Sequence, residues 1–377
     1  MSKSEASLLE AVDRIARDIV AAQASVVDKD ALYPSQAIAA LAEEGVLGLL
    51  SSSDIGGLGL GPRAAAAVVE RLARECGSTA MIVCMHFAGA SVIERFGSEQ
   101  VRRELAAGKH LSTLAFSEQG SRSMFWAPVS SAERIDGGNV SLSARKSWVT
   151  SANYAHSYVW SSRAMVGDTG NTLWLVPRTT AGLRIGSGFD GMGLRGNDSV
   201  PVVAEGATVP AAAMLGADGQ GLSIMLEVVL PLFNLLNAAS SVGMMEVAVQ
   251  RSAAHAAGTR YEHSGSALAD LPTLRAYIAR MRVATDMARC LMLDTATSIE
   301  SGRADAMLRV LECKAAAGES AGEVLDLAMR VCGGAAFRRE VAVERIFRDS
   351  RAANVMAPTT DQLYDFLGKA VCGLPVF

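Results

Sequence analysis

One stretch of this 377-residue chain, Ala115–Ser151, constrains the fold most, because it interrupts the helical patterns that flank it. It contains two motifs that mix polar and aromatic residues, AFSEQGSRS (Ala115–Ser123) and ARKSWVTSA (Ala144–Ala152). A hairpin signal lies between them, Asp136-Gly137-Gly138-Asn139, with alternating residues on both sides. Each motif is typical of a strand end that runs into a loop. Such ends leave hydroxyl and backbone N–H groups free for the edge of a flat ring, and Trp148 supplies an aromatic face.

Composition favours close-packed helices and excludes several classes of protein. Hydrophobic residues make up 50% of the chain and the mean hydropathy is +0.23, but only 5% of the residues are aromatic. We therefore expect a core of Ala, Val, Leu and Met, which suits helix packing and extensive subunit contacts. The net charge is −4 and there is no basic run, so neither nucleic acid nor an anionic membrane is expected as a partner.

The sequence shows no targeting or metal-binding signal. The first residues carry acids and lack an apolar signal-peptide core, and no stretch holds the roughly 18 uninterrupted apolar residues of a spanning helix. The six cysteines are scattered without a CxxC pair, which predicts buried free thiols and no metal site. We therefore expect a soluble, cytoplasmic protein.

Periodicity divides the chain into three predicted domains. Residues 1–111 follow a helical pattern with a Gly-rich connector. Residues 112–218 are rich in β-branched residues and turns, and strands are predicted at Ser112–Phe116, Asn139–Ala144, Tyr158–Arg163, Leu173–Pro177, Leu183–Gly186 and Val200–Glu205. Residues 219–377 return to helical periodicity. The predicted fold is α+β and mostly α, with an N-terminal helical domain, a middle β-barrel or sandwich domain and a C-terminal four-helix bundle.

One histidine lies inside a segment that we expect to be a buried helix. His86 belongs to Ser78–Phe96, which is nearly all apolar. A histidine in such a place either bonds a backbone carbonyl in the core or lines a pocket. The second interpretation keeps His86 among the candidate substrate contacts.

Five motifs in this order resemble the acyl-CoA dehydrogenase family of flavoproteins over nearly the whole chain. AFSEQGSRS is similar to the family's L-T-E-P-x-x-G-S-D, and ARKSWVTSA is similar to G-x-K-x-W-I-T-N. Three later segments resemble the family's M-G-x-R-x-S-D-T, V-P-x-x-x-x-L-G and Q-x-x-G-G motifs, namely Gly188–Ser199, Ala207–Glu227 and Arg330–Arg351. Each motif alone is weak, but five at the right spacing are strong.

The resemblance implies FAD as the cofactor and gives roles to particular residues. Ser117 stands where a Thr hydroxyl meets the flavin ring edge, and Ser123 where a Ser meets the FAD phosphates. Trp148 and Thr150 stand where the family packs an indole against the isoalloxazine and bonds its N5 region. These side chains are therefore the predicted cofactor contacts within one chain.

Further implied contacts involve a second subunit. Gly333 and Gly334 correspond to a close approach of backbone to the partner's FAD, and Arg260 to an Arg that reaches its diphosphate. Thr359 stands where a Thr contacts the cofactor. A cofactor site at a subunit interface implies an obligate oligomer, either a homotetramer or a homodimer.

The sequence departs from the family at the catalytic base. The family uses a carboxylate that takes the α-proton of the thioester while hydride leaves for the flavin. Ala357 fills the usual place of that carboxylate, and Leu232 fills its alternative place on the first helix of the bundle. The catalytic residue is therefore unknown, and Glu118, Glu227 and Asp361 are the other carboxylates that could serve.

The positions that bind the substrate in the family also differ in this sequence. Phe233 and Leu230 replace an Arg and an acid that help to hold the CoA chain, which favours a carrier-bound or atypical acyl group. Pro231 in the same helix is expected to open or kink it. Two Gln of the cofactor pattern are replaced by Arg330 and Leu363, so FMN or a degenerate site are alternatives to FAD.

A loop between the two opening motifs supplies further substrate candidates. Arg122 could pair with an anionic substrate group, and Phe125 and Trp126 could wall an apolar pocket; the alternative is an exposed Arg beside packing aromatics. Phe233 and Met356 complete the set of candidate substrate contacts.

These observations favour a dehydrogenase-like flavoenzyme that acts on an acyl thioester of CoA or a carrier protein and passes electrons to an acceptor flavoprotein. The alternative is a flavin-dependent monooxygenase of the same fold, which needs no α-proton base but does need a flavin reductase. A third hypothesis, a flavin-binding protein kept for assembly, is disfavoured by the intact set of Ser117, Trp148 and Thr150.

Overall fold

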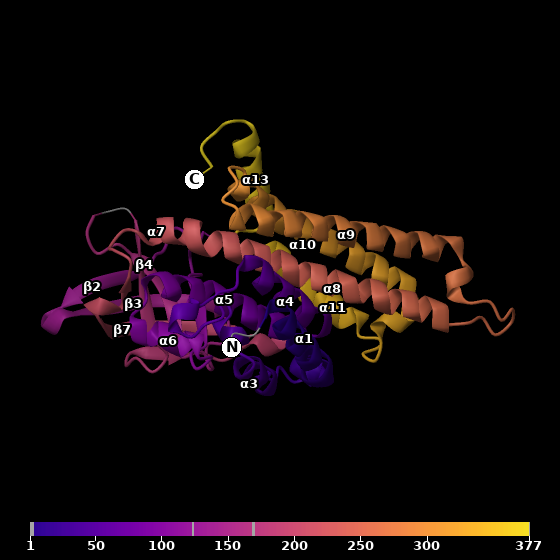
Figure 1. Ribbon diagram of the computed structural model, residues 1–377, viewed down its shortest axis with the longest axis horizontal. Coiled ribbons are helices and arrows are strands. Elements are labelled where there is room, and N and C mark those ends of the chain that lie inside the picture. Colours follow the sequence, from indigo (N-terminus) through magenta and orange to yellow (C-terminus); the bar gives the residue numbers. More distant parts are fainter. Residues whose placement is uncertain (1–3, 123, 168–169, 377) are drawn as a thin grey trace.

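A computed structural model describes residues 4–122, 124–167 and 170–376 (Figure 1). Strands gather at one end of the molecule, long helices run toward the other end, and the N-terminal helices lie beside both (Figure 1). This arrangement confirms the predicted fold class.

The N-terminal region is helical, as its periodicity indicates. Its helices are α1 (Glu5–Ile15), α2 (Ala21–Lys29), α3 (Ser35–Glu43), α4 (Pro62–Glu75), α5 (Gly77–Phe96) and α6 (Glu99–Ala106). A π turn, Ala16–Val20, joins the first two. The apolar helix α5 is buried along most of its length and packs against the first strand and against the C-terminal helices, so it ties the regions together.

The β region contains two four-stranded sheets that pack face to face. One has the order β1 (Ser112–Ala115), β4 (Ser157–Arg163), β5 (Asn171–Pro177) and β8 (Met214–Leu215). The other has the order β2 (Ser131–Ile135), β3 (Asn139–Val149), β7 (Val200–Pro210) and β6 (Leu183–Ile185). Buried side chains from both sheets, such as Trp160, Trp174, Leu142 and Val202, share one core.

The predicted hairpin is present, since β2 and β3 pair in antiparallel fashion around Asp136–Gly138. All six predicted strands form. The hairpin signal implied β2 without giving its range, and the structure shows an edge strand whose last three residues are exposed. Strand β8 was not predicted, because its two residues are too few to show the alternation of a half-buried strand.

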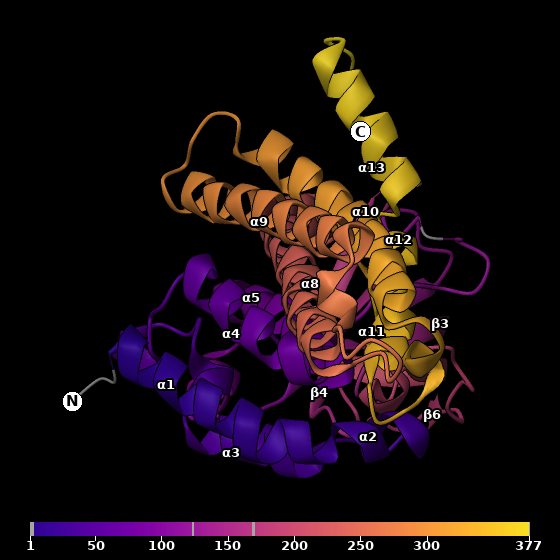
Figure 2. The same ribbon diagram turned by 90° about the vertical axis from the view of Figure 1, so that its right-hand side faces the viewer.

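The C-terminal region holds three long helices rather than the four that the sequence predicted. They are α8 (Leu230–Gly258), α9 (Pro272–Glu300) and α10 (Ala306–Cys332), and α8 is preceded by α7 (Gly221–Ile224) and a π turn, Met225–Val229. The rest of the chain forms the shorter helices α11 (Val343–Ser350), α12 (Ala352–Val355) and α13 (Thr360–Val371). In Figure 2, α13 extends away from the body of the molecule. The segment expected as the fourth helix, after the turn at Gly333–Phe337, is interrupted at Arg351 and around Pro358.

The N-terminal helices and the bundle share a single core. Helix α4 packs along α8 so closely that a Cβ on Gly243 would lie 2.2 Å from the Glu70 carbonyl oxygen. Helix α5 and the run α7–α8 are long and apolar enough to cross a membrane, but 83% and 67% of their most apolar windows are buried inside the protein. Their apolar character is therefore explained by the core that they form.

Candidate functional site

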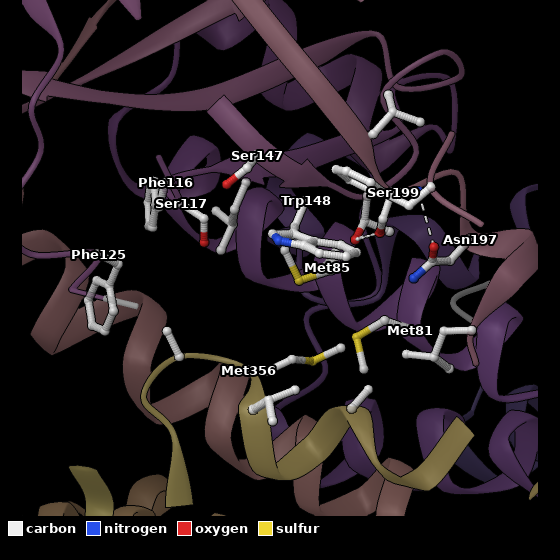
Figure 3. Close-up of a pocket in the computed structure, with 18 of the residues that line it drawn as sticks. Met81, Met85, Phe116, Ser117, Phe125, Ser147, Trp148, Asn197, Ser199 and Met356 are labelled. Atoms are coloured by element: carbon white, nitrogen blue, oxygen red, sulfur yellow. Dashed lines mark hydrogen bonds between the residues drawn. The ribbon is translucent and has the colours of Figure 1, made fainter. Parts of the chain in front are cut away.

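A cavity of about 650 Å³ lies where the three regions meet (Figure 3). Its lining comes from α5, from the ends of β1 and β3, from the segment 188–200, from the π turn and the start of α8, and from the loop after α12. Segments far apart in the sequence therefore build one site. Both motifs that open the sequence analysis contribute to its wall.

Trp148 presents an exposed indole to this cavity. A β-bulge between Lys146 and Val149 breaks the register of β3, and Trp148 has a left-handed backbone with φ 57°. Its side chain is 59% exposed and stacks on Phe189, with ring centroids 4.1 Å apart. An indole backed on one side and bare on the other is a platform for a second flat ring.

Hydroxyl groups surround this platform. Ser117 and Ser147 lie on one side of Trp148 and Ser199 on the other (Figure 3). The Thr150 Oγ1 atom is 3.0 Å from the Ser199 Oγ atom, so these two side chains hold each other in place. Across the opening, Met81 and Met356 form an apolar wall (Figure 3). The cavity therefore has one polar-aromatic wall and one apolar wall.

Unusual backbone conformations gather around the cavity. Seven described residues other than Gly have a positive φ, and five of them line the cavity: Ala31, Arg122, Trp148, Leu194 and Asp198. Such conformations cost roughly 1–3 kcal/mol each and persist only where the surroundings impose them. Leu194, for example, is held by its N–H, which donates to the Asp349 Oδ1 atom at 2.6 Å. This clustering marks the cavity as a functional site.

A buried ion pair fixes the two motifs to each other. Lys146 Nζ donates to the Glu118 Oε1 atom at 2.5 Å, and both side chains are fully buried. Glu118 also accepts from the Val129 N–H at 2.6 Å and from the Ser130 N–H and hydroxyl. Burial lowers the pKa of Lys146 to about 8 although Glu118 opposes this shift. Burial favours the neutral acid at Glu118, but Lys146 and the hydrogen bonds outweigh it and hold the pKa of Glu118 below its ordinary value.

Glu118 is therefore held as the partner of Lys146, and the other two candidate carboxylates lie outside the cavity lining. Glu227 and Asp361 are exposed and do not line the cavity. The second carboxylate of the described lining, Asp198, accepts from the Asn153 backbone N–H at 2.7 Å and from its side-chain amide at 2.9 Å. Ala357, which the sequence pattern predicts at the place of the family's carboxylate, does line the cavity. The described lining thus contains no carboxylate without a partner.

A second buried lysine supports the loop that carries Ala357. Lys314 on α10 is 1% exposed, and its ammonium donates to the carbonyl oxygens of Ala353 at 3.1 Å, Met356 at 3.0 Å and Pro358 at 2.7 Å. Burial lowers the pKa of Lys314 to about 7. Lys314 therefore holds the backbone of the loop whose Met356 forms part of the apolar cavity wall.

The expected distortion of the first bundle helix is a π turn. It spans Met225–Val229 and ends just before Pro231, with the Leu230 N–H bonded to the Met225 carbonyl. Because proline has no N–H, the wider turn lets the helix continue past it. Met225, Val229, Leu230 and Phe233 then face the cavity, whereas Leu232 is buried and does not.

Four of the five predicted substrate contacts line the cavity, namely Arg122, Phe125, Phe233 and Met356. His86 does not, which corrects that prediction. Its Nε2 atom lies 2.8 Å from the Leu47 carbonyl, its Nδ1 atom accepts from the Ser112 N–H at 3.2 Å, and burial lowers its pKa to about 4. Both ring nitrogens are used by the backbone, so His86 is a core residue.

The predicted cofactor contacts separate into two groups. Ser117, Trp148 and Thr150 line the cavity. Gly333 and Gly334 are exposed at the end of α10, Arg260 is exposed and bonded to the Gly265 carbonyl, and Thr359 caps α13. None of these four lines the cavity of its own chain, so the roles predicted for Gly333, Gly334 and Arg260 would require a second copy. Ser123 lies outside the described residues.

Sequence reasoning missed several lining residues. Met81 and Met85 lie one turn apart on α5 and face the cavity, and Met225 faces it from the π turn. The spacing of four residues between Met81 and Met85 was readable, but it does not distinguish a pocket from a core. Phe189 was within a recognised motif, yet nothing in the motif predicts its stack on Trp148.

Comparisons with known proteins agree with this geometry. Models of the N-terminal, middle and C-terminal domains of acyl-CoA dehydrogenase match residues 2–108, 113–207 and 219–371. The chain is 26% identical over 369 residues to the probable acyl-CoA dehydrogenase YngJ of Bacillus subtilis, covering 96% of each chain. The butyryl-CoA dehydrogenase structure from Megasphaera elsdenii matches with a TM-score of 0.92 at 22% identity and 98% coverage of both chains. The prolyl acyl carrier protein oxidase AnaB matches with a TM-score of 0.89 at 20% identity, covering 97% of this chain and 98% of its own.

The donor set of the cavity fits the cofactor of that family. A flavin needs an aromatic surface for its ring and small hydroxyls for its polar edge, and Trp148, Ser117 and Thr150 supply these on one wall. The three domain models together span nearly all of the chain, in the order that the fold requires. The chain belongs to the acyl-CoA dehydrogenase family, whose members are FAD-dependent oxidoreductases that act on CH–CH donors.

Proposed function

We propose that this chain is an FAD-dependent oxidoreductase that acts on an acyl thioester without the family's usual glutamate base. The observation that supports the proposal is that a polar-aromatic wall and an apolar wall face each other across one cavity. Trp148 stands in a wall suited to a flavin, and Met81 and Met356 stand in an apolar wall opposite it (Figure 3). An acyl chain between them would be desolvated and held against the ring.

The residues of this chain orient the reactants. FAD, when bound, supplies the hydride acceptor. Trp148 would cover one face of the ring, so that only the face toward the methionines stays open to a substrate. The Thr150 hydroxyl is engaged by Ser199 and keeps capacity for one further hydrogen bond, toward a polar ring atom.

The α-proton needs a different acceptor from that of the family pattern. Ala357 has no acid, and the two described carboxylates of the lining are bonded to Lys146 and Asn153. We therefore propose a substrate whose α-proton is acidic enough to be lost without a free protein carboxylate.

A carrier-bound acyl group agrees with the substrate side of the cavity. Leu230 and Phe233 are apolar and face the cavity, where the family pattern has an acid and an Arg for the CoA chain. One structural neighbour is named as a prolyl acyl carrier protein oxidase, so the fold serves a carrier-bound group in that protein. We further propose a homotetramer or homodimer that passes its electrons to an acceptor flavoprotein.

The missing carboxylate also favours a second candidate function. A flavin-dependent monooxygenase needs no α-proton base, and the described cavity lining offers none that is free. Such an enzyme would depend on a flavin reductase rather than on a thioester for its electrons.

An anaerobic titration tests the two candidates against each other. Purified protein with oxidised FAD is mixed with a panel of acyl-CoA and acyl-carrier thioesters, and the flavin absorbance at about 450 nm is followed. We expect bleaching by a carrier-bound thioester. A flavin that no thioester bleaches, but that a reductase reduces and oxygen then reoxidises, would replace the first candidate with the second.

Two variants show whether the assigned cavity is the reacting site. Thr150→Ala should slow the bleaching by about 10-fold or more, because a hydrogen bond to the ring is lost. Thr208→Ala removes a hydroxyl from the exposed side of β7 and should leave the rate unchanged. Equal bleaching rates in the two variants would show that the reaction does not take place in this cavity.

A further inference from the structure

The ionisable groups that line the cavity differ in whether they have partners. Among the described residues the lining contains Glu118, Arg122, Arg195 and Asp198. Glu118 is paired with Lys146, and Asp198 is bonded to Asn153. The two arginines are therefore the candidates for binding a charged group of a ligand.

Arg195 is held by an ion pair and by two backbone carbonyls. Its guanidinium donates to the Asp190 Oδ1 atom at 2.6 Å, to the Asp28 carbonyl at 2.8 Å and to the Gly191 carbonyl at 2.9 Å. Arg122 differs, because its exposed guanidinium has no hydrogen bond or ion pair with any residue that the structure describes. Within the described lining, Arg122 is the one charged side chain that is free to bind a ligand.

Hydrogen bonds within its turn fix the backbone position of Arg122. The turn that holds it is tied to Glu118, whose carbonyl accepts from both the N–H and the hydroxyl of Ser121. The Met124 N–H closes the turn on the Ser121 carbonyl at 3.1 Å. Through Glu118 the turn is anchored to the buried Lys146, so the backbone that carries Arg122 is fixed to the sheet.

The backbone of Arg122 is itself unusual. Its φ is 44°, in the left-handed region that Gly adopts without steric cost and that other residues rarely occupy. When Ser117 is matched to the Thr of the family motif L-T-E-P-x-x-G-S-D, the Gly of that motif falls on Arg122. A long charged side chain on a backbone that would suit glycine is an outlier that motivates a functional hypothesis.

We propose that Arg122 binds a phosphate group of the ligand. This inference rests on the proposed function, whose two ligands both carry phosphate away from the reacting end: the diphosphate of FAD and the phosphate of a phosphopantetheine arm. A planar guanidinium donates two parallel hydrogen bonds to phosphate oxygens, and it needs no other counter-charge. The apolar residues of the lining, such as Met81 and Met85, suit the uncharged part of the same ligand.

Binding titrations with matched ligand pairs test this proposal without any turnover. For the cofactor, calorimetry on cofactor-free protein compares FAD and FMN with riboflavin; FMN differs from riboflavin by a phosphate alone, whereas FAD adds the diphosphate and the adenosine. For the substrate, titrations of the FAD-loaded protein compare hexanoyl-pantetheine with hexanoyl-4′-phosphopantetheine. Each pair is measured for the wild type, Arg122→Gly, Arg122→Lys and the control Arg14→Ala, which removes an exposed charge on α1.

The expected result is a loss confined to one phosphorylated ligand. Arg122→Gly should weaken that ligand by about 10- to 100-fold and leave its unphosphorylated partner unchanged, and Arg122→Lys should give a smaller loss. A loss for FAD identifies the cofactor diphosphate, whereas a loss for the phosphopantetheine thioester identifies the carrier arm. Since Gly suits the left-handed backbone, Arg122→Gly should melt no earlier than the wild type.

Other outcomes overturn the proposal. Unchanged affinities in both pairs, or equal losses with and without the phosphate, would show that Arg122 does not recognise that group. Failure of every thioester to bleach the flavin would refute the proposed function alone, because these titrations measure binding.

Discussion

Two buried lysines support opposite walls of the cavity, and they differ in how their charge is balanced. Lys146 and Lys314 are each 1% exposed and each makes three hydrogen bonds. Lys146 meets the Glu118 carboxylate and two oxygens of Ser161, whereas Lys314 meets three backbone carbonyls. Among the described residues no carboxylate is paired with Lys314.

The difference shows two ways of fixing a loop next to a ligand. At Lys146 the charges cancel, and each partner depends on the other. At Lys314 the charge has no counter-ion, so burial acts almost unopposed and lowers the pKa to about 7, compared with about 8 for Lys146. A rise of pH should therefore remove the proton of Lys314 behind the apolar wall before it affects Lys146 behind the polar-aromatic wall.

The largest effect is expected when the pair is broken. Glu118→Ala leaves a buried ammonium without its carboxylate and should lower the free energy of unfolding by about 3–5 kcal/mol. Denaturant unfolding measures this, with Glu133→Ala on the exposed edge strand β2 as the control, which should change stability by less than about 0.5 kcal/mol. Replacing both Glu118 and Lys146 by Met should recover much of the loss. A loss below about 1 kcal/mol in Glu118→Ala would show that water or another group replaces the carboxylate.

A smaller loss is expected at the other lysine. Lys314→Met leaves three carbonyls without their donor but also removes a buried charge, so the net cost should be about 2 kcal/mol. The local effect is more specific, because the peptide that contains Met356 should exchange its amide hydrogens faster. Lys369→Met, on the more exposed helix α13, is the control. Unchanged exchange at Met356 would mean that Lys314 does not hold this loop.

The same two lysines show what could be predicted from the sequence. The polar-aromatic wall was predictable as part of a site, because Ser117, Trp148 and Thr150 lie in motifs whose composition differs from the surrounding helices. The ion pair behind them was not, since Glu118 and Lys146 are separated by 28 residues and meet only through strand pairing. Lys314 looks in sequence like any lysine of a helix, and only the folded loop of α12 gives it acceptors.

Backbone geometry limited the sequence reasoning as well. The distortion at Pro231 was predicted because proline lacks a donor, but its form as a π turn depends on packing. The left-handed φ of Trp148 follows from a bulge that no residue type announces. His86 was ambiguous for a related reason: an apolar helix shows that a histidine is buried, but not which backbone groups will meet its ring.

The smallest effect, a pH dependence, separates the two lysines most clearly. Below pH 7 Lys314 is protonated in both the folded and the unfolded chain, so it adds no slope. Between pH 7 and the ordinary lysine value of about 10.4, the unfolded chain binds the proton more tightly than the folded chain, so the free energy of unfolding rises with pH. Lys146 begins to contribute in the same direction only above about pH 8.

From pH 7 to pH 8, the free energy of unfolding of the wild type should therefore rise by about 1 kcal/mol more than that of Lys314→Met. From about pH 6 to about pH 6.5, the two proteins should show nearly the same change. Paired urea titrations at fixed ionic strength measure it. A difference that stays flat through pH 8 would mean that the three carbonyls keep the ammonium charged, and that Lys314 balances its charge as fully as Lys146 does.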